Sequence, residues 1–193
     1  MGRKSDPRER ESLLTEERFE LLRPEALLRA LGVHEGDTVA DIGCGPGFFT
    51  VPAAEIVGEH GRVLAGDIQG EMLAAARSRV VERGLTNVRM VKTSDTEVPL
   101  PAGCADLVLL AFTLSEIGQR ARFLHRVARV LKPEGRIVVI EWQKHEEADG
   151  PPLADRIGPE DVIKDAEAAG LHLREQRSLN EHHYVCIFLT HPA

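Results

Sequence analysis

Short apolar runs alternate with longer amphipathic stretches along most of this chain. The apolar runs have the length of β-strands and cover residues 38–42, 62–67, 88–92, 106–111 and 136–141. Several of the stretches between them repeat apolar residues at helical spacing, over residues 48–57, 71–83, 121–131 and 159–169. The run 106–111 is almost continuously apolar, which is typical of a central strand covered on both faces. The pattern predicts strands and helices in regular alternation.

The last two predicted strands, residues 171–177 and 183–190, have no helical stretch between them. Regular strand–helix alternation produces right-handed βαβ units, and hence a parallel sheet with helices on both faces. A direct connection without a crossover helix requires the final strand to run antiparallel to the one before it. We therefore expect an α/β, Rossmann-like fold in which a mostly parallel, seven-stranded sheet ends in a C-terminal β-hairpin with a reversed last strand.

The N-terminal residues 1–32 form a separate part of the pattern. The first 22 residues are highly charged, but Leu13, Leu14, Phe19, Leu21 and Leu22 recur at roughly helical spacing and predict an amphipathic helix. Pro24 stands at the favoured first position of a second short helix that ends near Gly32. We expect residues 1–32 to be a helical segment that acts as a lid, and residues 33–193 to be the ligand-binding domain.

Composition excludes several classes of protein. A net charge of −7 over 193 residues argues against nucleic acid as a partner, because phosphates are usually met by a basic face. Three distant cysteines, Cys44, Cys104 and Cys186, indicate neither a disulfide framework nor a metal site. The N-terminus lacks the apolar core of a signal peptide, and no stretch approaches the length of a membrane span. These features predict a cytoplasmic protein and leave its oligomeric state open.

The most informative segment is the loop after the first predicted strand. It places Gly43, Gly45 and Gly47 at alternate positions between a strand and a helix, where the backbone turns tightly and approaches a ligand closely. The spacing departs from the dinucleotide fingerprint, whose third glycine comes one residue later. Asp41 at the mouth of the loop would repel a pyrophosphate and favour a ligand that carries an ammonium and a sulfonium, as S-adenosylmethionine does. A role for Asp41 as a turn or helix cap is the alternative.

A second acidic residue lies at the end of the second predicted strand. Asp67 is placed to accept hydrogen bonds from both ribose hydroxyls, a role that nicotinamide and S-adenosylmethionine proteins share. Ile68 and Met72 follow and are candidates for packing on adenine, although core packing explains Met72 equally well. These residues indicate an adenosine-bearing cofactor without choosing between the two.

Taken together, four segments resemble the class I S-adenosylmethionine-dependent methyltransferases, and particularly the small-molecule enzymes similar to quinone-biosynthesis and arsenite methyltransferases. They are the loop 41–47, the strand end at Asp67, the segment 99–106 and the segment 131–136. The resemblance implies S-adenosylmethionine as cofactor, S-adenosylhomocysteine as product, and a methyl acceptor that is a small molecule. It also assigns cofactor-binding roles to Asp41, Gly43, Cys44, Gly45, Gly47, Asp67, Ile68, Met72 and Ala111.

The chain departs from this family pattern at two positions. Ser94, followed by Asp95, stands where relatives place an acid near the adenine amine, so we assign adenine to this pair without choosing between its members. Glu116 stands where relatives of this type often have a histidine. Arsenite methylation needs convergent thiols, and the predicted strands separate Cys44 from Cys104, which argues against that activity.

The methyl acceptor should bind beyond the carboxyl ends of the parallel strands. Because the last strand is reversed, its first residues reach the same edge. These considerations predict a substrate pocket formed by Thr113, Trp142, His182 and Tyr184, with Glu116 and His183 as candidate catalytic bases. A surface or structural role is the alternative for each base.

The sequence thus predicts a methyltransferase, without identifying the acceptor. Two other interpretations remain at this point. One is a cofactor-binding or regulatory protein on the same fold without turnover. The other is an NAD(P)-dependent oxidoreductase, which the glycine spacing and Asp41 disfavour.

Overall fold

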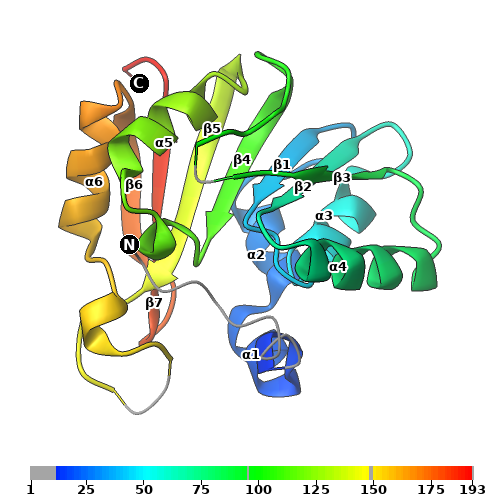
Figure 1. The fold of residues 1–193 in the computed structure, drawn as a ribbon, viewed down its shortest axis with the longest axis horizontal. Coiled ribbons are helices and arrows are strands. Elements are labelled where there is room, and N and C mark those ends of the chain that lie inside the picture. Colours follow the sequence, from blue (N-terminus) through cyan, green and yellow to red (C-terminus); the bar gives the residue numbers. More distant parts are fainter. Residues whose placement is uncertain (1–11, 95, 148–149, 193) are drawn as a thin grey trace.

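A single twisted sheet runs through the structure, a computed structural model that describes residues 12–94, 96–147 and 150–192 (Figure 1). The seven strands lie in the order β3-β2-β1-β4-β5-β7-β6. Their bounds are β1 Thr38–Ile42, β2 Arg62–Asp67, β3 Val88–Lys92, β4 Ala105–Ala111, β5 Leu131–Trp142, β6 His172–Ser178 and β7 His183–Leu189. The first five strands pair in parallel, and β7 is antiparallel to both β5 and β6. The predicted fold, including the reversed last strand, is confirmed.

Helices cover both faces of the sheet. They are α1 Glu16–Leu22, α2 Pro24–Ala30, α3 Thr50–Val57, α4 Gly70–Glu82, α5 Arg120–Ala128 and α6 Pro159–Ala168, with short 3₁₀ turns η2 Ser12–Leu14, η3 Leu114–Glu116 and η4 Leu153–Asp155. Helices α5 and α6 pack on one face, while α2 and α3 pack on the other. In the described part of the chain, no helix is long and apolar enough to cross a membrane.

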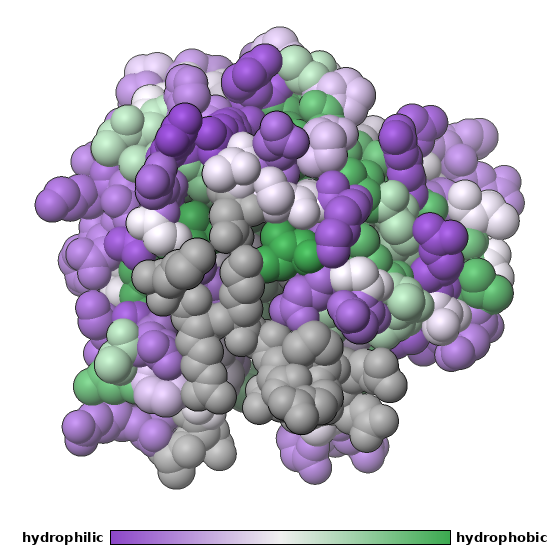
Figure 2. Space-filling view, viewed as in Figure 1, coloured by the Kyte–Doolittle hydropathy of each residue, from purple (hydrophilic) through white to green (hydrophobic). Residues whose placement is uncertain are grey.

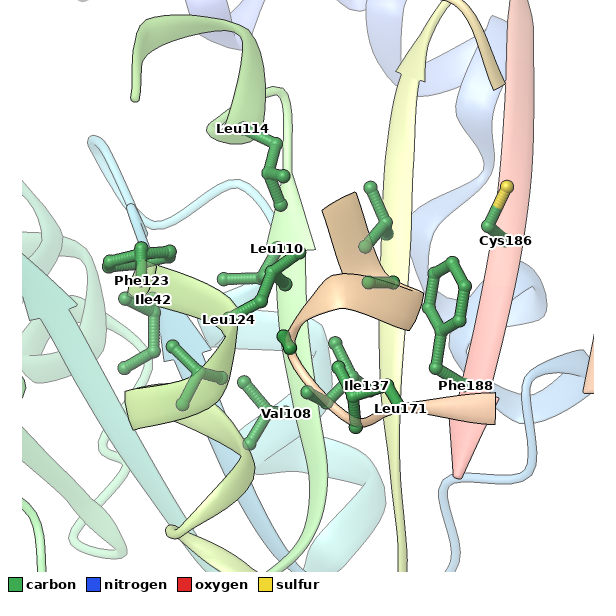
Figure 3. Packing of buried hydrophobic residues seen from close by; sticks show 14 of the residues in the cluster. Ile42, Val108, Leu110, Leu114, Phe123, Leu124, Ile137, Leu171, Cys186 and Phe188 are labelled. Atoms are coloured by element: carbon green, nitrogen blue, oxygen red, sulfur yellow. The ribbon is translucent and has the colours of Figure 1, made fainter. Parts of the chain in front are cut away.

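The central strands contribute side chains to two hydrophobic clusters, one on each face. Along β4, Val108 and Leu110 face α5 and α6, whereas Leu107 and Leu109 face the opposite helices. Figure 3 shows the first cluster, where Leu124 of α5 lies against β4, Phe123 of the same helix lies beside Ile42, and Phe188 of β7 lies close to α6. Because both faces are covered, the central strands are apolar throughout, as the sequence pattern predicts.

The N-terminal segment is built from shorter pieces than the sequence pattern suggests. Residues 1–11 lie outside the described part of the chain, and the predicted amphipathic helix is here the turn η2 followed by α1. Leu22 is buried and Phe19 packs against the same cluster as α2 and α3, but Leu21 is 42% exposed. Arg136 of β5 donates hydrogen bonds to the carbonyl oxygens of Leu31 and Gly32 and thereby fixes the end of α2. The segment is thus attached to the sheet at its C-terminal end.

The strand β5 begins earlier than expected. Leu131 pairs with Ala105, and the register then shifts so that Arg136 pairs with Leu107. The segment 132–135, which the sequence pattern suggested as a turn before the strand, is instead a bulge within it. A Cβ added at Gly135 would lie 2.9 Å from the Ala105 carbonyl oxygen, so the two backbones approach too closely there for a side chain.

On the face of the molecule drawn in Figure 2, hydrophilic side chains cover most of the described surface, with hydrophobic ones in small patches between them.

Tyr184 is expected from the sequence to line the substrate pocket, but the structure places it in the hydrophobic core instead. Side chains alternate between the two faces of a strand, so Tyr184 and its neighbour His183 point in opposite directions along β7. Tyr184 is 0% exposed, lies in the cluster beneath α5 and α6, and donates its hydroxyl to the Ile157 carbonyl oxygen at 2.9 Å. Burial raises the pKa of this phenol far above its usual range, so the hydroxyl stays neutral.

We expect Tyr184→Phe to lower the free energy of unfolding by about 1–3 kcal/mol, because the Ile157 carbonyl loses its buried partner. For a chain of this length, that corresponds to a fall in Tm of about 2–4 °C for each kcal/mol. Urea and thermal unfolding measure the effect, and binding of S-adenosylhomocysteine serves as the control and should not change. An unchanged stability with altered ligand binding would contradict the core position of Tyr184.

Candidate active site

A cleft opens at the carboxyl ends of β1, β2 and β4. The strand order reverses between β1 and β4, which is where open α/β sheets bind their ligands. The lining comes from the loops that follow these strands and β3, from helices α4 and α5, and from the N-terminal segment. It consists of Leu13, Arg18, Asp41, Ile42, Gly43, Cys44, Gly45, Pro46, Phe48, Phe49, Asp67, Ile68, Gln69, Met72, Thr93, Ser94, Ala111, Phe112, Thr113, Glu116, Ile117 and Phe123.

The glycine loop after β1 forms the floor of this cleft. The backbone N–H groups of Gly43 and Cys44 both donate to the Gly66 carbonyl oxygen, at 2.7 and 3.0 Å, which ties the loop to β2. Gly43 has φ +80°, and an added Cβ would lie 2.2 Å from the Thr113 hydroxyl oxygen. An added Cβ at Gly45 would meet nothing within 4 Å. The backbone at Gly45 is therefore open to a ligand, whereas Gly43 is required for packing.

Gly47 is the last residue of the glycine loop, and it is not among the residues that line the cleft. Its φ is +86°, and an added Cβ would lie 3.2 Å from the Ala76 Cβ of α4. This residue lets the loop pass close to the neighbouring helix, and α3 consequently begins at Thr50 instead of at Phe48 as the sequence pattern suggests. The structure thus shows a packing role for Gly47 in shaping the loop.

Asp67 lies at the end of β2 with both carboxylate oxygens held by backbone donors. One oxygen accepts from the N–H of Gly45 at 2.9 Å and the other from the N–H of Gln69 at 2.8 Å. The side chain is only 7% exposed, and burial raises the pKa of its carboxyl. Each oxygen still has a lone pair, so the fixed carboxylate is suited to accept the two hydroxyls of a ribose.

Asp41 is the more deeply buried of the two acids, at 2% exposure. One of its carboxylate oxygens accepts a hydrogen bond from the Thr50 hydroxyl at 2.6 Å. Burial raises the pKa of Asp41 to about 7, and the nearby charge of Asp67 adds to this effect. A cationic ligand in the cleft would favour the ionised form. The cap interpretation also has support, since Thr50 is the first residue of α3.

Cys44 stays a neutral thiol beside these acids. Burial, followed by the charges of Asp41 and Asp67, raises the pKa of the thiol well above its usual range. Its sulfur lies 3.6 Å from the Gly45 carbonyl oxygen, to which it donates. A nucleophilic role is therefore not supported, because the thiolate is the reactive form.

The side expected to hold adenine is formed by Ile68, Met72, Thr93 and Ser94. Met72 is 2% exposed, so most of its surface packs inside the protein and only part of it reaches the cleft. The Ser94 hydroxyl accepts hydrogen bonds from the backbone N–H groups of Thr96 and Glu97, at 3.3 and 2.9 Å. Asp95 lies outside the described residues. Ser94 thus both lines the cleft and stabilises its own turn.

The exit of β4 forms the opposite wall. Ala111, Thr113 and Glu116 all line the cleft, as the sequence predicts. The Thr113 hydroxyl lies 3.1 Å from the Ala111 carbonyl oxygen and 3.3 Å from that of Ile42, so it links β1 to β4. Phe112, which lies between Ala111 and Thr113 in the sequence, adopts φ +57°, a left-handed conformation that is strained for a bulky residue.

A buried acid that the sequence reasoning missed supports this wall. Glu141 of β5 is 1% exposed and accepts a hydrogen bond from the Ser115 backbone N–H at 3.1 Å. Burial raises its pKa to about 7. Glu141 therefore positions the turn η3, which carries Glu116 to the cleft. A single acid between apolar residues at the end of a predicted strand was the sequence feature that could have identified Glu141.

Three rings gather behind Phe112, at the end of β5 and the start of β7. His183 lies 5.1 Å from Phe112 and 4.3 Å from Trp142, measured between ring centroids, and His182 lies 6.5 Å from Trp142. Only Phe112 of this group lines the cleft itself. The structure thus brings Trp142, His182 and His183 together, but separates them from the cleft by one aromatic ring.

The hydrogen bonds of His183 determine its tautomer. The Asn180 side-chain oxygen accepts from the backbone N–H groups of His182 and His183, at 2.9 and 2.8 Å, and must be a carbonyl oxygen. His183 Nδ1, 3.1 Å from the same oxygen, therefore donates to it. The lone pair is then on Nε2, which is buried and has no partner among the described residues. Burial, and next the charge of Arg18, lower the pKa of His183 to about 4.

His182 is engaged in an ion-pair network over Trp142. Glu147 accepts from both His182 and Arg156, and the hydrogen bond from His182 is the main cause of its lowered pKa. Arg156 is 5% exposed, lies with its guanidinium carbon 5.2 Å from the Trp142 ring centroid, and donates to the Pro151 carbonyl oxygen at 2.8 Å. This network closes the loop after β5. The position of His182 is therefore explained by loop packing.

Arg18 is the residue of the cleft that the sequence gave no reason to select. It stands in the charged run Glu16-Glu17-Arg18, which is typical of a solvated helix face. Its guanidinium carbon lies 5.0 Å from the Phe48 ring centroid and 4.8 Å from that of Phe112. Burial lowers its pKa to about 10, and its Nε has no partner among the described residues.

Comparison with solved structures supports the class that the sequence resembles, the S-adenosylmethionine-dependent methyltransferases. A SAM-dependent methyltransferase from Aquifex aeolicus is 34% identical, with a TM-score of 0.92 over 96% of this chain and 98% of that one. The [4+2]-cyclase SpnF shares the fold at 19% identity, with a TM-score of 0.74 over 86% of this chain and 79% of its own. The fold, the acidic cleft and the Aquifex relative define a class I S-adenosylmethionine-dependent methyltransferase, with S-adenosylmethionine as its cofactor.

Sequence relatives narrow this class to one family. Residues 12–149 match the model of the ubiE/COQ5 methyltransferase family, and the chain belongs to that family. A protein of Azotobacter vinelandii named ubiquinone/menaquinone biosynthesis C-methyltransferase UbiE is 39% identical over 114 residues, which are 58% of this chain and 45% of the relative. The protein of that name in a Marinomonas species is 35% identical over 116 residues, which are 60% and 46% of the two chains. The match thus spans about half the length of these relatives.

We expect the charge on Asp41 to make cofactor binding depend on pH. A cation favours the ionised carboxylate, so below pH 7 binding of S-adenosylmethionine must expel a proton. We expect the association constant to rise by up to about tenfold per pH unit towards pH 7 and to level off above it. Titration calorimetry between pH 5.5 and 8.5, in two buffers of different ionisation enthalpy, measures both affinity and proton release.

The matched control for this prediction is Asp41→Asn, which cannot titrate. It should bind more weakly at neutral pH and lose the part of the pH dependence that Asp41 contributes. An affinity of the unmodified protein that does not vary with pH, or proton uptake on binding, would contradict the role of Asp41.

Proposed function

We propose that this protein transfers the methyl group of S-adenosylmethionine to a ring carbon of a small hydroxylated aromatic acceptor, such as a quinone precursor in its reduced form. Family membership supports methyl transfer. The relatives named above as C-methyltransferases of ubiquinone and menaquinone biosynthesis support carbon as the accepting atom. Because only about half of their length is matched, the acceptor is argued from the site of this chain.

The observation that carries the proposal is Nε2 of His183, which lies behind an aromatic wall and has no partner in the described part of the chain. A buried lone pair without a donor is unfavourable, and an acceptor hydroxyl would supply the missing hydrogen bond. Because the pKa of His183 is about 4, the imidazole is neutral at physiological pH and its lone pair is available. Phe112 and Trp142 offer apolar surfaces that suit an aromatic ring.

Residues of the cleft and of the ring cluster behind Phe112 would have different roles in such a reaction. S-adenosylmethionine, when bound, supplies a methyl group on a positively charged sulfur, which leaves with the electron pair of the broken bond. His183 Nε2 accepts a hydrogen bond from the acceptor hydroxyl and takes its proton as the neighbouring ring carbon forms the new bond, when the hydroxyl becomes strongly acidic. The proton on that carbon is lost afterwards to solvent, and His183 returns its proton to the ring oxygen. Asp41 and Asp67 hold the cofactor in one orientation, so that proximity contributes much of the rate.

Access to His183 requires a movement of Phe112. This ring belongs to the cleft wall and contacts the imidazole at 5.1 Å between centroids. Its left-handed backbone lies in a sparsely populated region, where strain favours rearrangement. The acceptor would take the place of the Phe112 ring against His183. Glu116, which already lines the cleft, is the second candidate base.

The N-terminal segment would cover the acceptor as a lid. Leu13 and Arg18 line the cleft although they precede the sheet in sequence. A cover of this kind excludes water from the reacting atoms. The comparisons lend no support to a nicotinamide-dependent oxidoreductase or to a protein without turnover, and the assay below distinguishes them from a methyltransferase.

We expect turnover with reduced quinone-type acceptors, and we expect His183→Gln to lower kcat by about 100-fold or more, the usual contribution of a general base. The affinity for S-adenosylhomocysteine should stay unchanged. Mass spectrometry detects the added methyl group, and NMR of the product distinguishes carbon from oxygen methylation.

His34→Gln is the matched control, because the His34 side chain is 76% exposed and far from the ring cluster in sequence. Glu116→Gln compares the second candidate base under the same conditions. Full activity of His183→Gln together with a large loss in Glu116→Gln would reassign the base. Oxygen methylation, or no turnover by a protein that binds the cofactor, would contradict the proposed acceptor chemistry.

A further inference from the structure

The ionisable side chains that line the cleft are unevenly balanced. Among the described residues, the acids Asp41, Asp67 and Glu116 face a single cation, Arg18. S-adenosylmethionine brings two positive groups, the ammonium and the sulfonium, and one negative group, the carboxylate of its methionine part. The acids suit the two positive groups, and the carboxylate is left with one complementary side chain in the lining.

Arg18 has donors to offer. Its guanidinium lies against the faces of Phe48 and Phe112, so its polar edge is directed away from both rings. Nε is buried without a partner among the described residues, and the described residues provide no ion pair for this side chain. A buried cation without an anion is costly unless a ligand supplies one.

The two aromatic contacts also place Arg18 at the methionine end of the cofactor. Phe48 directly follows the glycine loop, and Phe112 directly follows Ala111 at the end of β4. Asp41, which suits the ammonium, lies near the end of β1, the strand that leads into the glycine loop and pairs with β4. The ribose acid Asp67 lies beyond, on β2. An ammonium and a carboxylate on the same carbon atom must bind close together.

We infer that Arg18 binds the methionine carboxylate of S-adenosylmethionine, and that this ion pair holds α1 over the cleft. The inference rests on the proposed function, since it requires that cofactor. Helix α1 is otherwise attached through few groups: Leu22 is buried, and Phe19 lies 4.5 Å from Phe48 between ring centroids. The N-terminal segment would therefore close in response to the cofactor, before the acceptor reacts.

The alternative anion is an ionised hydroxyl of the acceptor. Phe112 contacts His183 as well as Arg18, so an acceptor that displaced this ring would approach both side chains. The balance of charges in the cleft favours the cofactor carboxylate. The two anions are separated by a cofactor analogue that lacks only the carboxylate.

Titration calorimetry with S-adenosylmethionine and with its decarboxylated analogue, S-adenosylmethioninamine, tests the inference on the full chain. We expect Arg18→Met, which keeps an unbranched apolar stem, to weaken binding of S-adenosylmethionine about 10- to 100-fold, as expected for a lost charged hydrogen bond. Binding of the decarboxylated analogue should change less than about twofold. Arg18→Lys should recover part of the loss, because it keeps the charge without the fork of donors.

Arg29→Met is the matched control, because Arg29 lies on the neighbouring helix α2, is exposed, and pairs only with Glu25 among the described residues. It should bind both ligands as the unmodified protein does. Hydrogen exchange gives a second readout: S-adenosylmethionine should protect residues 12–22 in the unmodified protein, and this protection should be lost in Arg18→Met and with the decarboxylated analogue.

Each of the other outcomes would contradict the inference on Arg18 in a different way. Equal weakening of both ligands would show that Arg18 acts by packing, and no weakening of either would remove it from cofactor binding. Unchanged cofactor affinity with a raised KM for the acceptor would assign Arg18 to the acceptor. If the unmodified protein bound neither adenosyl ligand, the proposed function itself would fail, and the inference with it.

Discussion

The hydrogen bonds that Asp67 accepts from Gly45 and Gln69 hold together the two loops on which the site depends. Gly45 belongs to the loop after β1, and Gln69 to the loop after β2, so one carboxylate fixes both backbones. The first loop then places the open backbone of Gly45 and the acid Asp41 in the cleft. Because these groups come from adjacent parallel strands, the strand order of the sheet determines where the cofactor binds.

The other half of the site is assembled from more distant parts of the chain. Glu141 of β5 positions the turn that carries Glu116, while Asn180 before β7 fixes the tautomer of His183. Phe112 connects this half to the cleft. The acids of the first half are held by hydrogen bonds, whereas the aromatic half has a strained backbone and a nitrogen without a partner among the described residues. Such a division suits an enzyme that holds its cofactor firmly and accommodates its acceptor by rearrangement.

Local patterns in the sequence were sufficient for the fold and for the cofactor half. The strands 38–42, 62–67 and 88–92 were predicted at their observed bounds, because short apolar runs between turn residues specify a buried strand. The glycine spacing and the two acids likewise act through their neighbours in sequence. The bulge in β5 was missed because it depends on the register with β4, which pairs residues distant along the chain.

The acceptor half was harder to predict for the same physical reason. Placing residues at the start of β7 located the correct edge of the sheet, but only the face of the strand decides that His183 joins Phe112 while Tyr184 enters the core. Arg18 gave no signal, since an arginine in a charged helix looks the same whether it faces water or a ligand. Burial and missing partners, which only the structure reveals, distinguish the two cases.

We expect the acidic cleft to bind a cationic adenosyl cofactor and to reject a pyrophosphate. Titration calorimetry of the unmodified protein at pH 7.5, with S-adenosylmethionine and with NADH in parallel, measures both properties in one experiment. Saturable binding of the adenosyl ligand with one site per chain, and no heat from NADH, is the expected result. Binding of NADH, or of neither ligand, would contradict the assignment of Asp41 and Asp67 to this cofactor.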